Sequence, residues 1–436
     1  MLRTISFIER VEIDFNGSIF NQAMVLGDLD NDKDCELAVG SIEGDLCVFK
    51  GSSQVAWKKW SDLGMITCVG IGDICGTGKN HLVCLTAEGW CYIFDIKADS
   101  TVTEGVSGKV AEDDSDKLMM PAFNQHLPAN GKCMLIADVD GEGHTELVVG
   151  YSDRVVRSFR WHTGPETDGD THGRLVQTEK WQLAEQIGSM TMNFCEGGKP
   201  LLLVSQPGGT YAKLYYSAQS PTDNDVHTDV SEDSIHPHLC YDHLGASRAH
   251  NKTISTEIIG GIQRNGQLNI KNGTFYALCT VDGTLVLVQN GGILWSLLVD
   301  HQLFSLTKLD VTGNGSEEVV CCSWDGQTYI VNHSRDVVRY QFEENVAGFL
   351  AGSYAVTPHE NVPCFVYATF NNRIYIYYNI HLPQVESTNL IEVMNREQET
   401  HELLARLNIS AAEPSQLKQL YHWCLYGQHG NNSTVK

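Results

Sequence analysis

The sequence predicts an all-β protein: a seven-bladed β-propeller closed by an N-terminal strand, with a short α-helical C-terminal tail. Three observations predict this fold. A pattern of strand, Gly/Asp-rich turn, strand, tight hairpin and strand recurs seven times, seven matching hairpin turns give an independent count, and a helical apolar period replaces the strand pattern after residue 381. Four-stranded repeats joined by hairpins are typical of propeller blades.

The repeats are clearest in copies one, three and six, "AMVLGDLDNDKDCELAVGSIEGDLCVFK", "CMLIADVDGEGHTELVVGYSDRVVRSFRW" and "LFSLTKLDVTGNGSEEVVCCSWDGQTYIV". Their hairpins use Gly and Asn, which tolerate the positive φ that such turns require. At its shortest, from Asp282 to Asp325, the spacing of the turns suits one four-stranded blade. The seven expected two-residue turns are Glu43-Gly44, Glu88-Gly89, Ser152-Asp153, Pro207-Gly208, Asp282-Gly283, Asp325-Gly326 and Asn371-Asn372.

The ring needs a closing strand, and the N-terminus can supply it. The seventh copy ends its strand pattern at Tyr378, whereas the N-terminal "TISFIERVEIDF" has a strand pattern and no blade of its own. We expect this segment to form the outer strand of the last blade, which would leave no open sheet edge.

The propeller is expected over residues 1–381 and a helical extension over 382–436. Two polar insertions, about 98–118 and 217–250, have the composition of disordered segments. The second is rich in histidine, but without Cys or carboxylate at ligand spacing it reads as a solvated loop rather than a metal site.

The last predicted helix has a periodic apolar face. It begins near Pro414 and ends before Gly427, as helix-start and helix-stop preferences favour. The face is a candidate partner-binding surface, although packing on the propeller rim explains it equally well. Its residues are Leu417, Leu420, Tyr421, Cys424 and Leu425.

Acidic residues at alternate positions follow the first strand of several copies, as oxygen ligands do in calcium loops. The same residue types also build such turns without metal, through hydrogen bonds from the backbone to their side chains. Open loops of this kind in extracellular modules bind calcium with dissociation constants of about 10⁻⁴–10⁻³ M. We therefore expect the acidic residues to be a signature of the fold, with no calcium or other cofactor bound in the cytosol. The candidate metal ligands are Asp28, Asp30, Asp32 and Glu36 in copy one, and Asp138, Asp140, Glu142 and Glu146 in copy three.

Composition excludes several classes of function. With 30 Lys and Arg against 54 Asp and Glu, the net charge of −24 disfavours binding to nucleic acid or to anionic lipid. We find no signal peptide and no apolar run long enough to span a membrane. The 14 cysteines are scattered singly, mostly in strand-like runs, as buried thiols are in a reducing compartment. "CGTGKN" departs from a phosphate loop, and no nucleophile elbow or HExxH motif occurs, so we predict no enzyme.

The unit "DVDGEGHTELVVGYSDRVVRSFRW" resembles the FG-GAP repeat of integrin α-chain propellers, although the literal Phe-Gly and Gly-Ala-Pro elements are absent. With "QHLPAN", "CVGIGDICGTGKNHLV", "FYALCTVDGTL" and "VDHQLFSLTKLDVTGNGSEEVVCCSWDGQTYI", the chain is similar over nearly its whole length to an intracellular FG-GAP-repeat family of KICSTOR subunits.

This resemblance implies a non-catalytic scaffold subunit whose partners are kaptin, the large KICSTOR scaffold subunit and, through them, the Rag GTPase-activating complex. It implies a cytoplasmic protein held at the lysosomal membrane by its partners, where TOR complex signalling is inhibited when amino acids or glucose run short. The alternative is a generic cytosolic propeller scaffold in another complex.

Overall fold

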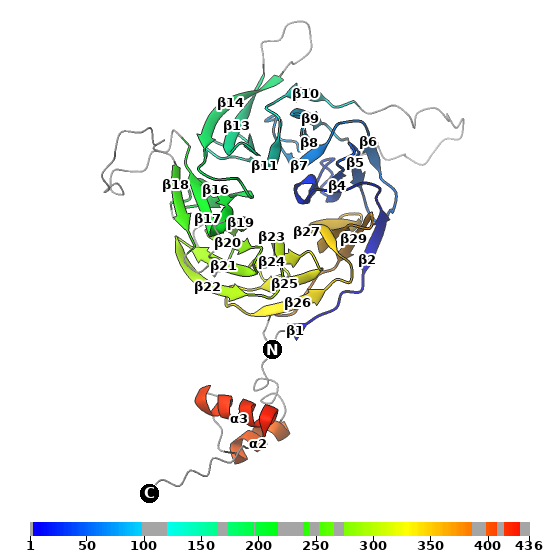
Figure 1. Ribbon diagram of the computed structural model, residues 1–436. Coiled ribbons are helices and arrows are strands. Elements are labelled where there is room, and N and C mark those ends of the chain that lie inside the picture. Colours follow the sequence, from blue (N-terminus) through cyan, green and yellow to red (C-terminus); the bar gives the residue numbers. More distant parts are fainter. Residues whose placement is uncertain are drawn as a thin grey trace, which may run out of the picture. The chain divides into compact units, whose positions relative to one another are not determined.

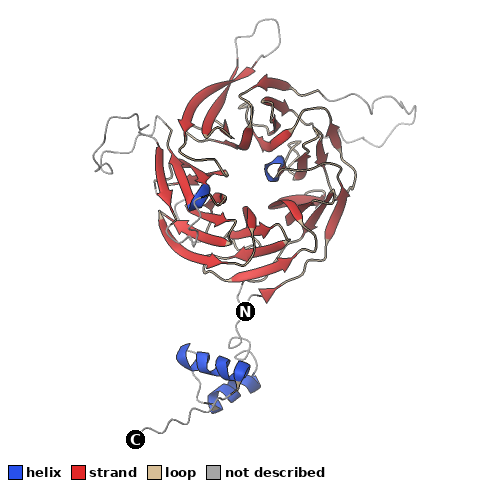
Figure 2. Cartoon of the chain, in the orientation of Figure 1, coloured by secondary structure: helices blue, strands red, loops and turns tan. Residues whose placement is uncertain are grey.

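The computed structural model describes residues 3–97, 120–163, 173–195, 197–216, 239–244, 253–265, 274–385, 398–407 and 414–427. The chain divides into two compact units, Ile5–Val385 and a second made of Met1–Thr4 with Glu386–Lys436. The first unit is a ring of seven sheets (Figures 1 and 2). The second contains β1 (Arg3–Thr4) and the helices α2 (Gln398–Arg406) and α3 (Pro414–Tyr426).

The strands of the ring form seven blades of four, which confirms the predicted fold. Blades one and two are β3 (Met24–Gly27), β4 (Glu36–Gly40), β5 (Leu46–Phe49), β6 (Lys58–Trp60), and β7 (Ile66–Gly72), β8 (His81–Thr86), β9 (Trp90–Phe94), β10 (Phe123–His126). Blades three and four are β11 (Gly131–Ala137), β12 (Glu146–Tyr151), β13 (Val155–Thr163), β14 (Gly173–Gln182), and β15 (Met190–Phe194), β16 (Pro200–Gln206), β17 (Thr210–Leu214), β18 (Leu239–His243). Blades five and six are β19 (Thr256–Ile262), β20 (Phe275–Thr280), β21 (Thr284–Gln289), β22 (Gly292–Leu298), and β23 (Leu303–Leu309), β24 (Glu318–Ser323), β25 (Gln327–Val331), β26 (Val337–Gln341). Blade seven is β27 (Val346–Thr357), β28 (Glu360–Thr369), β29 (Arg373–Tyr378) and β2 (Arg10–Asp14). Two short 3₁₀ turns, η1 (Asn21–Ala23) and η2 (Pro207–Gly209), complete the ring unit.

Neighbouring strands in every blade run antiparallel. The first strand of each blade lies towards the centre of the ring and the last at its rim (Figure 1). Second strands such as β4, β8, β12 and β24 are buried along their whole length. Both faces of these strands pack against neighbouring blades, which is why the sequence shows continuous apolar runs there.

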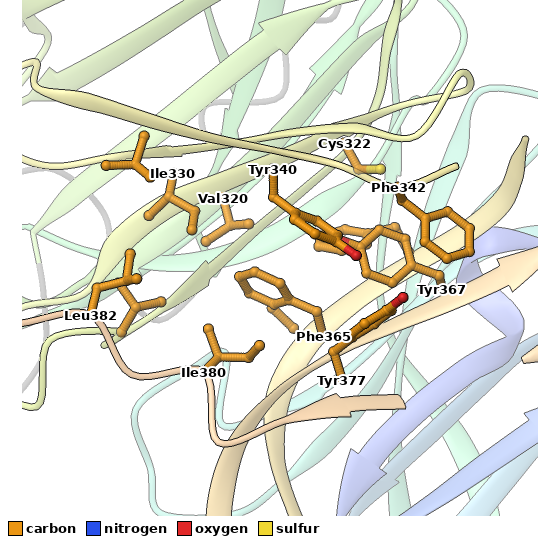
Figure 3. Packing of buried hydrophobic residues seen from close by; sticks show 14 of the residues in the cluster. Val320, Cys322, Ile330, Tyr340, Phe342, Phe365, Tyr367, Tyr377, Ile380 and Leu382 are labelled. Atoms are coloured by element: carbon orange, nitrogen blue, oxygen red, sulfur yellow. The ribbon is translucent and has the colours of Figure 1, made fainter. Parts of the chain in front are cut away.

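Seven hydrophobic clusters fill the seven contacts between neighbouring blades. The cluster between blades six and seven is the most aromatic, and its side chains interdigitate from both sheets (Figure 3). Phe342 stacks on Tyr367 with ring centroids 4.6 Å apart, and the rings of Phe349 and Phe365 lie 5.6 Å apart. Aromatic pairs at such distances add about 0.5–1.5 kcal/mol each to the burial of their surface.

The N-terminal segment closes the ring as predicted. Strand β2 pairs with β29 in register Ile13↔Ile374, and the side chain of Ile13 is fully buried. Before β2, the amide of Ile5 donates to the carbonyl of Arg339 in blade six, so this segment ties blade six to blade seven. Figure 1 shows β2 outside β29 at the rim.

All seven hairpin turns lie between the second and third strands of their blades, but the expected two-residue form was wrong. In blade two the connection is Ala87–Gly89, closed by a hydrogen bond from the Gly89 amide to the Thr86 carbonyl, with Gly89 at φ 98°. A Cβ at Gly89 would lie 2.3 Å from the carbonyl oxygen of Leu127, so both the backbone angle and the space require glycine here. A turn followed by a left-handed residue is the usual form of a three-residue hairpin loop.

Two boundaries differ from the sequence prediction. The insertion expected at 217–250 contains β18, the outer strand of blade four, which pairs with β17 from Thr210↔His243 to Leu214↔Leu239. Its residues are half-buried or exposed, so no apolar pattern marked the strand. Leu382 and Val385 are buried in the cluster between blades six and seven, so the propeller unit ends at Val385 rather than at 381. The insertion at 98–118 and, in the second insertion, residues 217–238 and 245–250 lie outside the described residues.

Candidate functional site

The acidic loop of blade one brings three carboxylates together, and a lysine lies among them. Oxygen atoms of Asp28, Asp30 and Asp32 lie within 4.8 Å of one another. The Nζ atom of Lys50, just after β5, lies 2.6 Å from Oδ2 of Asp30, 2.6 Å from Oδ2 of Asp32 and 3.0 Å from Oε1 of Glu36. The side chains of Asp30 and Glu36 are fully buried, whereas that of Lys50 is 29% exposed. One positive charge is therefore shared between two buried carboxylates and that of Asp32.

The loop of blade three repeats this arrangement with an arginine. The guanidinium of Arg160 in β13 pairs with Asp140, lies 2.6 Å from Oε1 of Glu146 and 3.4 Å from Oε2 of Glu142. The carboxylates of Asp138, Asp140 and Glu146 form the second group close enough to hold a metal ion within the described part of the chain. In both loops a basic side chain of the same blade pairs with three of the four predicted metal ligands, and the first aspartate, Asp28 or Asp138, is the one outside these ion pairs.

The strand register explains why these bases reach the loops. Glu146 and Arg160 face each other across the β12–β13 ladder. The Leu37↔Phe49 pair places Glu36 opposite Lys50 in the next step of the β4–β5 ladder. Sequence reasoning missed both bases, although each follows its glutamate at the same separation. The same separation in sequence predicts a contact between glutamate and base only when the register of the hairpin that joins their strands is known.

The glutamate that begins the second strand also holds the loop backbone. One carboxylate oxygen of Glu36 accepts the Leu29 amide at 2.9 Å, and Glu146 and Glu318 accept the amides of Val139 and Val311 at 3.0 Å. Burial raises the pKa of Glu36 and of Glu318 to about 7, and it also raises the pKa of Glu146. These carboxylates thus serve as internal acceptors in three blades.

The corresponding loops of blades two and six are held by backbone donors. Asp73 accepts the amides of Thr77 and Gly78 at 2.9 and 2.7 Å. Asp310 accepts those of Gly313 and Gly315 at 2.7 and 2.8 Å. Such side chain to backbone bonds form this turn without any ion.

The carboxylates of loops one and three have the chemistry and proximity that calcium requires. An ion at these carboxylates would compete with the ammonium of Lys50 or the guanidinium of Arg160. The geometry therefore favours loops closed by internal ion pairs, and the expectation that calcium does not occupy them in the cytosol stays a prediction.

Helix α3 is present where the sequence predicts it, and the Gly427 amide closes it by donating to the Trp423 carbonyl. Of the predicted apolar face, Leu420 is buried, whereas Tyr421 and Leu425 are 48% and 55% exposed. Trp423 and Tyr426, which the sequence reasoning did not select, are also exposed. The side chains of Leu417 and Cys424 lie outside the described residues. Binding of a partner at this helix remains a prediction.

Comparison with known proteins places the chain in a family. The family model for integrin-alpha FG-GAP repeat-containing protein 2 matches residues 50–382. A mouse (Mus musculus) relative, KICSTOR complex protein ITFG2, is 44% identical over 430 residues, which span 98% of this chain and 96% of the relative. The chain belongs to this family.

Other matches agree with this assignment. The cattle (Bos taurus) member of the FG-GAP repeat-containing protein 2 family, also named KICSTOR complex protein ITFG2, is 42% identical over 404 residues, covering 90% of this chain and 74% of that protein. Among solved structures, BBS1N in complex with ARL6DN matches 86% of this chain and 97% of its own with a TM-score of 0.58. At 12% identity, this likeness supports the propeller fold alone.

In the part of the chain that the structure describes, no helix has the length and apolar character needed to cross a membrane. The thirteen cysteines in the described part of the propeller unit are all unpaired, and most are buried in strands.

Proposed function

We propose that this protein is a non-catalytic scaffold subunit of the KICSTOR complex. The observation that carries the proposal is the 44% identity, over 98% of the chain, to a protein named as a KICSTOR component. The internal geometry supports it, because the acidic groups of loops one and three are engaged by Lys50 and Arg160. Carboxylates paired in this way stabilise loops, whereas acid–base catalysis needs groups that face a substrate.

Within this proposal, the chain associates with kaptin and the large scaffold subunit of KICSTOR. Through them it helps to recruit the Rag GTPase-activating complex to the lysosome and to inhibit TOR complex signalling under amino-acid or glucose deprivation. The protein is then cytoplasmic and reaches the lysosomal surface through its partners. The exposed side chains of α3 are the first candidates for these contacts, because large exposed aromatic residues are enriched at protein interfaces.

Affinity purification from cells tests this proposal. We would compare the full chain with a variant that ends at Val385, because a cut at 381 would remove Leu382 and Val385 from the propeller core. The full chain should recover kaptin and the large scaffold subunit. Loss of both from the shortened variant would assign docking to the C-terminal unit, whereas retention would assign it to the propeller.

A finer comparison keeps the helix intact. Tyr421→Ala with Leu425→Ala should weaken recovery if α3 docks. Gln419→Ala, at an exposed position on the opposite side of the same helix, should leave it unchanged. If the full chain recovers no KICSTOR subunit, the proposal fails. A generic propeller scaffold in another complex would then be the better account.

A further inference from the structure

A groove crosses blades five, six and seven on the face that carries the hairpin turns. It consists of two adjoining hollows of about 620 and 590 Å³ that share Asp300, His301 and Gln302, in the connection from β22 to β23. The first hollow continues to Trp324, Asp325 and Phe370 in the hairpins of blades six and seven, and the second to Asp282 and Leu298 in blade five. The acidic loops described above lie at the opposite face, because they join first strands to second strands.

The groove exposes large apolar side chains on a firmly held backbone. Trp324, Leu298 and Phe370 are 41%, 41% and 66% exposed. The indole of Trp324 stacks on the ring of Phe304, with centroids 5.6 Å apart and planes 8° from parallel. The backbone carbonyl of Trp324 accepts a hydrogen bond from the amide of Val346 at 2.9 Å, which ties the blade-six turn to blade seven. Exposed apolar residues gathered in a groove mark sites of interaction more often than scattered ones do.

The groove is also acidic. Asp282, Asp300 and Asp325 line the two hollows, and their linings include no lysine or arginine. His301 pairs with Asp325, with Nδ1 2.7 Å from Oδ2. Although burial acts to raise the pKa of Asp325, hydrogen bonds from Ser323 and His301 lower it overall, so the carboxylate stays ionised. Glu43, Glu88 and Asp153 occupy the hairpins of blades one to three on the same face. A surface with this charge attracts cationic segments and repels phosphates and anionic lipids.

We propose that this groove binds a basic peptide segment of a partner protein that also carries an aliphatic or aromatic anchor. The anchor packs against Trp324 and Phe370, while Arg or Lys side chains pair with Asp282, Asp300 and Asp325. An Arg side chain over the face of Trp324 would add a cation–π contact. This inference goes beyond membership of KICSTOR and does not depend on it.

Selection from a library of random twelve-residue peptides displayed on phage, with the full chain as bait, tests the proposal. Enriched peptides should carry a net positive charge together with Leu, Phe, Tyr or Trp. Synthetic copies should bind about tenfold or more weakly to D282N/D300N/D325N and should lose affinity as salt rises. They should bind E360Q unchanged, because Glu360 is an exposed carboxylate at the start of β28, where the β27–β28 connection ends on the opposite face.

Asp325 accepts hydrogen bonds from Ser323 in its own turn and from His301 in the β22–β23 connection, so a second variant, D300N/W324A, leaves Asp325 in place. This variant should bind the peptides about tenfold more weakly. Its unfolding temperature should fall by no more than a few degrees, the loss expected when Trp324 no longer stacks on Phe304. The proposal is overturned if the selection enriches nothing, if the enriched peptides are neutral or acidic, or if both groove variants bind them as the wild type does. None of these results would affect the purification test of KICSTOR membership.

Discussion

Replacing Lys50 by methionine should destabilise the propeller by about 3 kcal/mol at pH 8, because two buried carboxylates lose their counter-charge. The ammonium lies 2.6 Å from Asp30 and 3.0 Å from Glu36, and both of these side chains are fully buried. Removing one partner of a buried ion pair costs about 3–5 kcal/mol. The lower end applies, since 29% of the lysine side chain is exposed and the pair is partly screened.

The loss should depend on pH. Burial raises the pKa of Glu36 from 4.5 to about 7, so folding takes up a proton at this carboxyl between those values. Without the ammonium, the folded pKa of Glu36 rises further, and the variant loses stability as pH rises through it. The deficit relative to wild type should therefore grow between pH 6 and pH 8, by at most about 1.4 kcal/mol per pH unit for one proton.

Urea denaturation at both pH values measures this deficit. Lys59→Met is the matched control, because Lys59 pairs with Asp45 at 2.9 Å on the surface with 53% of its side chain exposed. Exposed pairs contribute about 0–1 kcal/mol. If the Lys50 and Lys59 variants are equally stable, or if about 1 mM calcium stabilises the wild type, the account of loops closed by internal ion pairs is wrong.

Three further predictions concern the core and the ring closure. Glu318→Gln should keep the acceptor for the Val311 amide and remove a carboxyl whose pKa burial raises to about 7, so urea denaturation should show a gain of roughly 1–3 kcal/mol at pH 8 that shrinks towards pH 5. Deleting residues 1–14 removes β2 and opens blade seven, so trypsin should digest this variant rapidly while a variant lacking residues 428–436 stays resistant. Phe365→Ala, in the aromatic cluster, should cost about 3–5 kcal/mol in a denaturation experiment. Phe370→Ala, at an exposed position, should change stability by less than about 0.5 kcal/mol, and equal losses at the two positions would contradict the packing in Figure 3.

Sequence patterns predicted the features of the fold that depend on local chemistry. Second strands such as β8 are buried on both faces, so they appear in the sequence as apolar runs that reveal the number of blades. Hairpins such as the one ending at Gly89 need a residue with positive φ, which reveals the positions of the turns. The closing strand β2 was predicted because its apolar pattern had no other blade to complete.

Features that depend on tertiary context were missed. Strand β18 is a short rim strand with no fully buried residue and no alternation of apolar and polar side chains, so only its ladder with β17 identifies it. In the sequence, nothing distinguishes Lys50 and Arg160 from basic residues on the surface. Only the register of the hairpin shows that they lie against Glu36 and Glu146. The groove at Trp324 combines hairpins of three blades, which no local pattern reveals.

We propose that this propeller, as a subunit of KICSTOR, acts in nutrient signalling. The most direct measurement is phosphorylation of a TOR complex substrate in amino-acid-starved cells that lack the chain, with and without the wild-type protein restored. The account predicts that phosphorylation persists in starved cells without the chain and falls when the protein is restored. Equal suppression by starvation in both cell lines would contradict it.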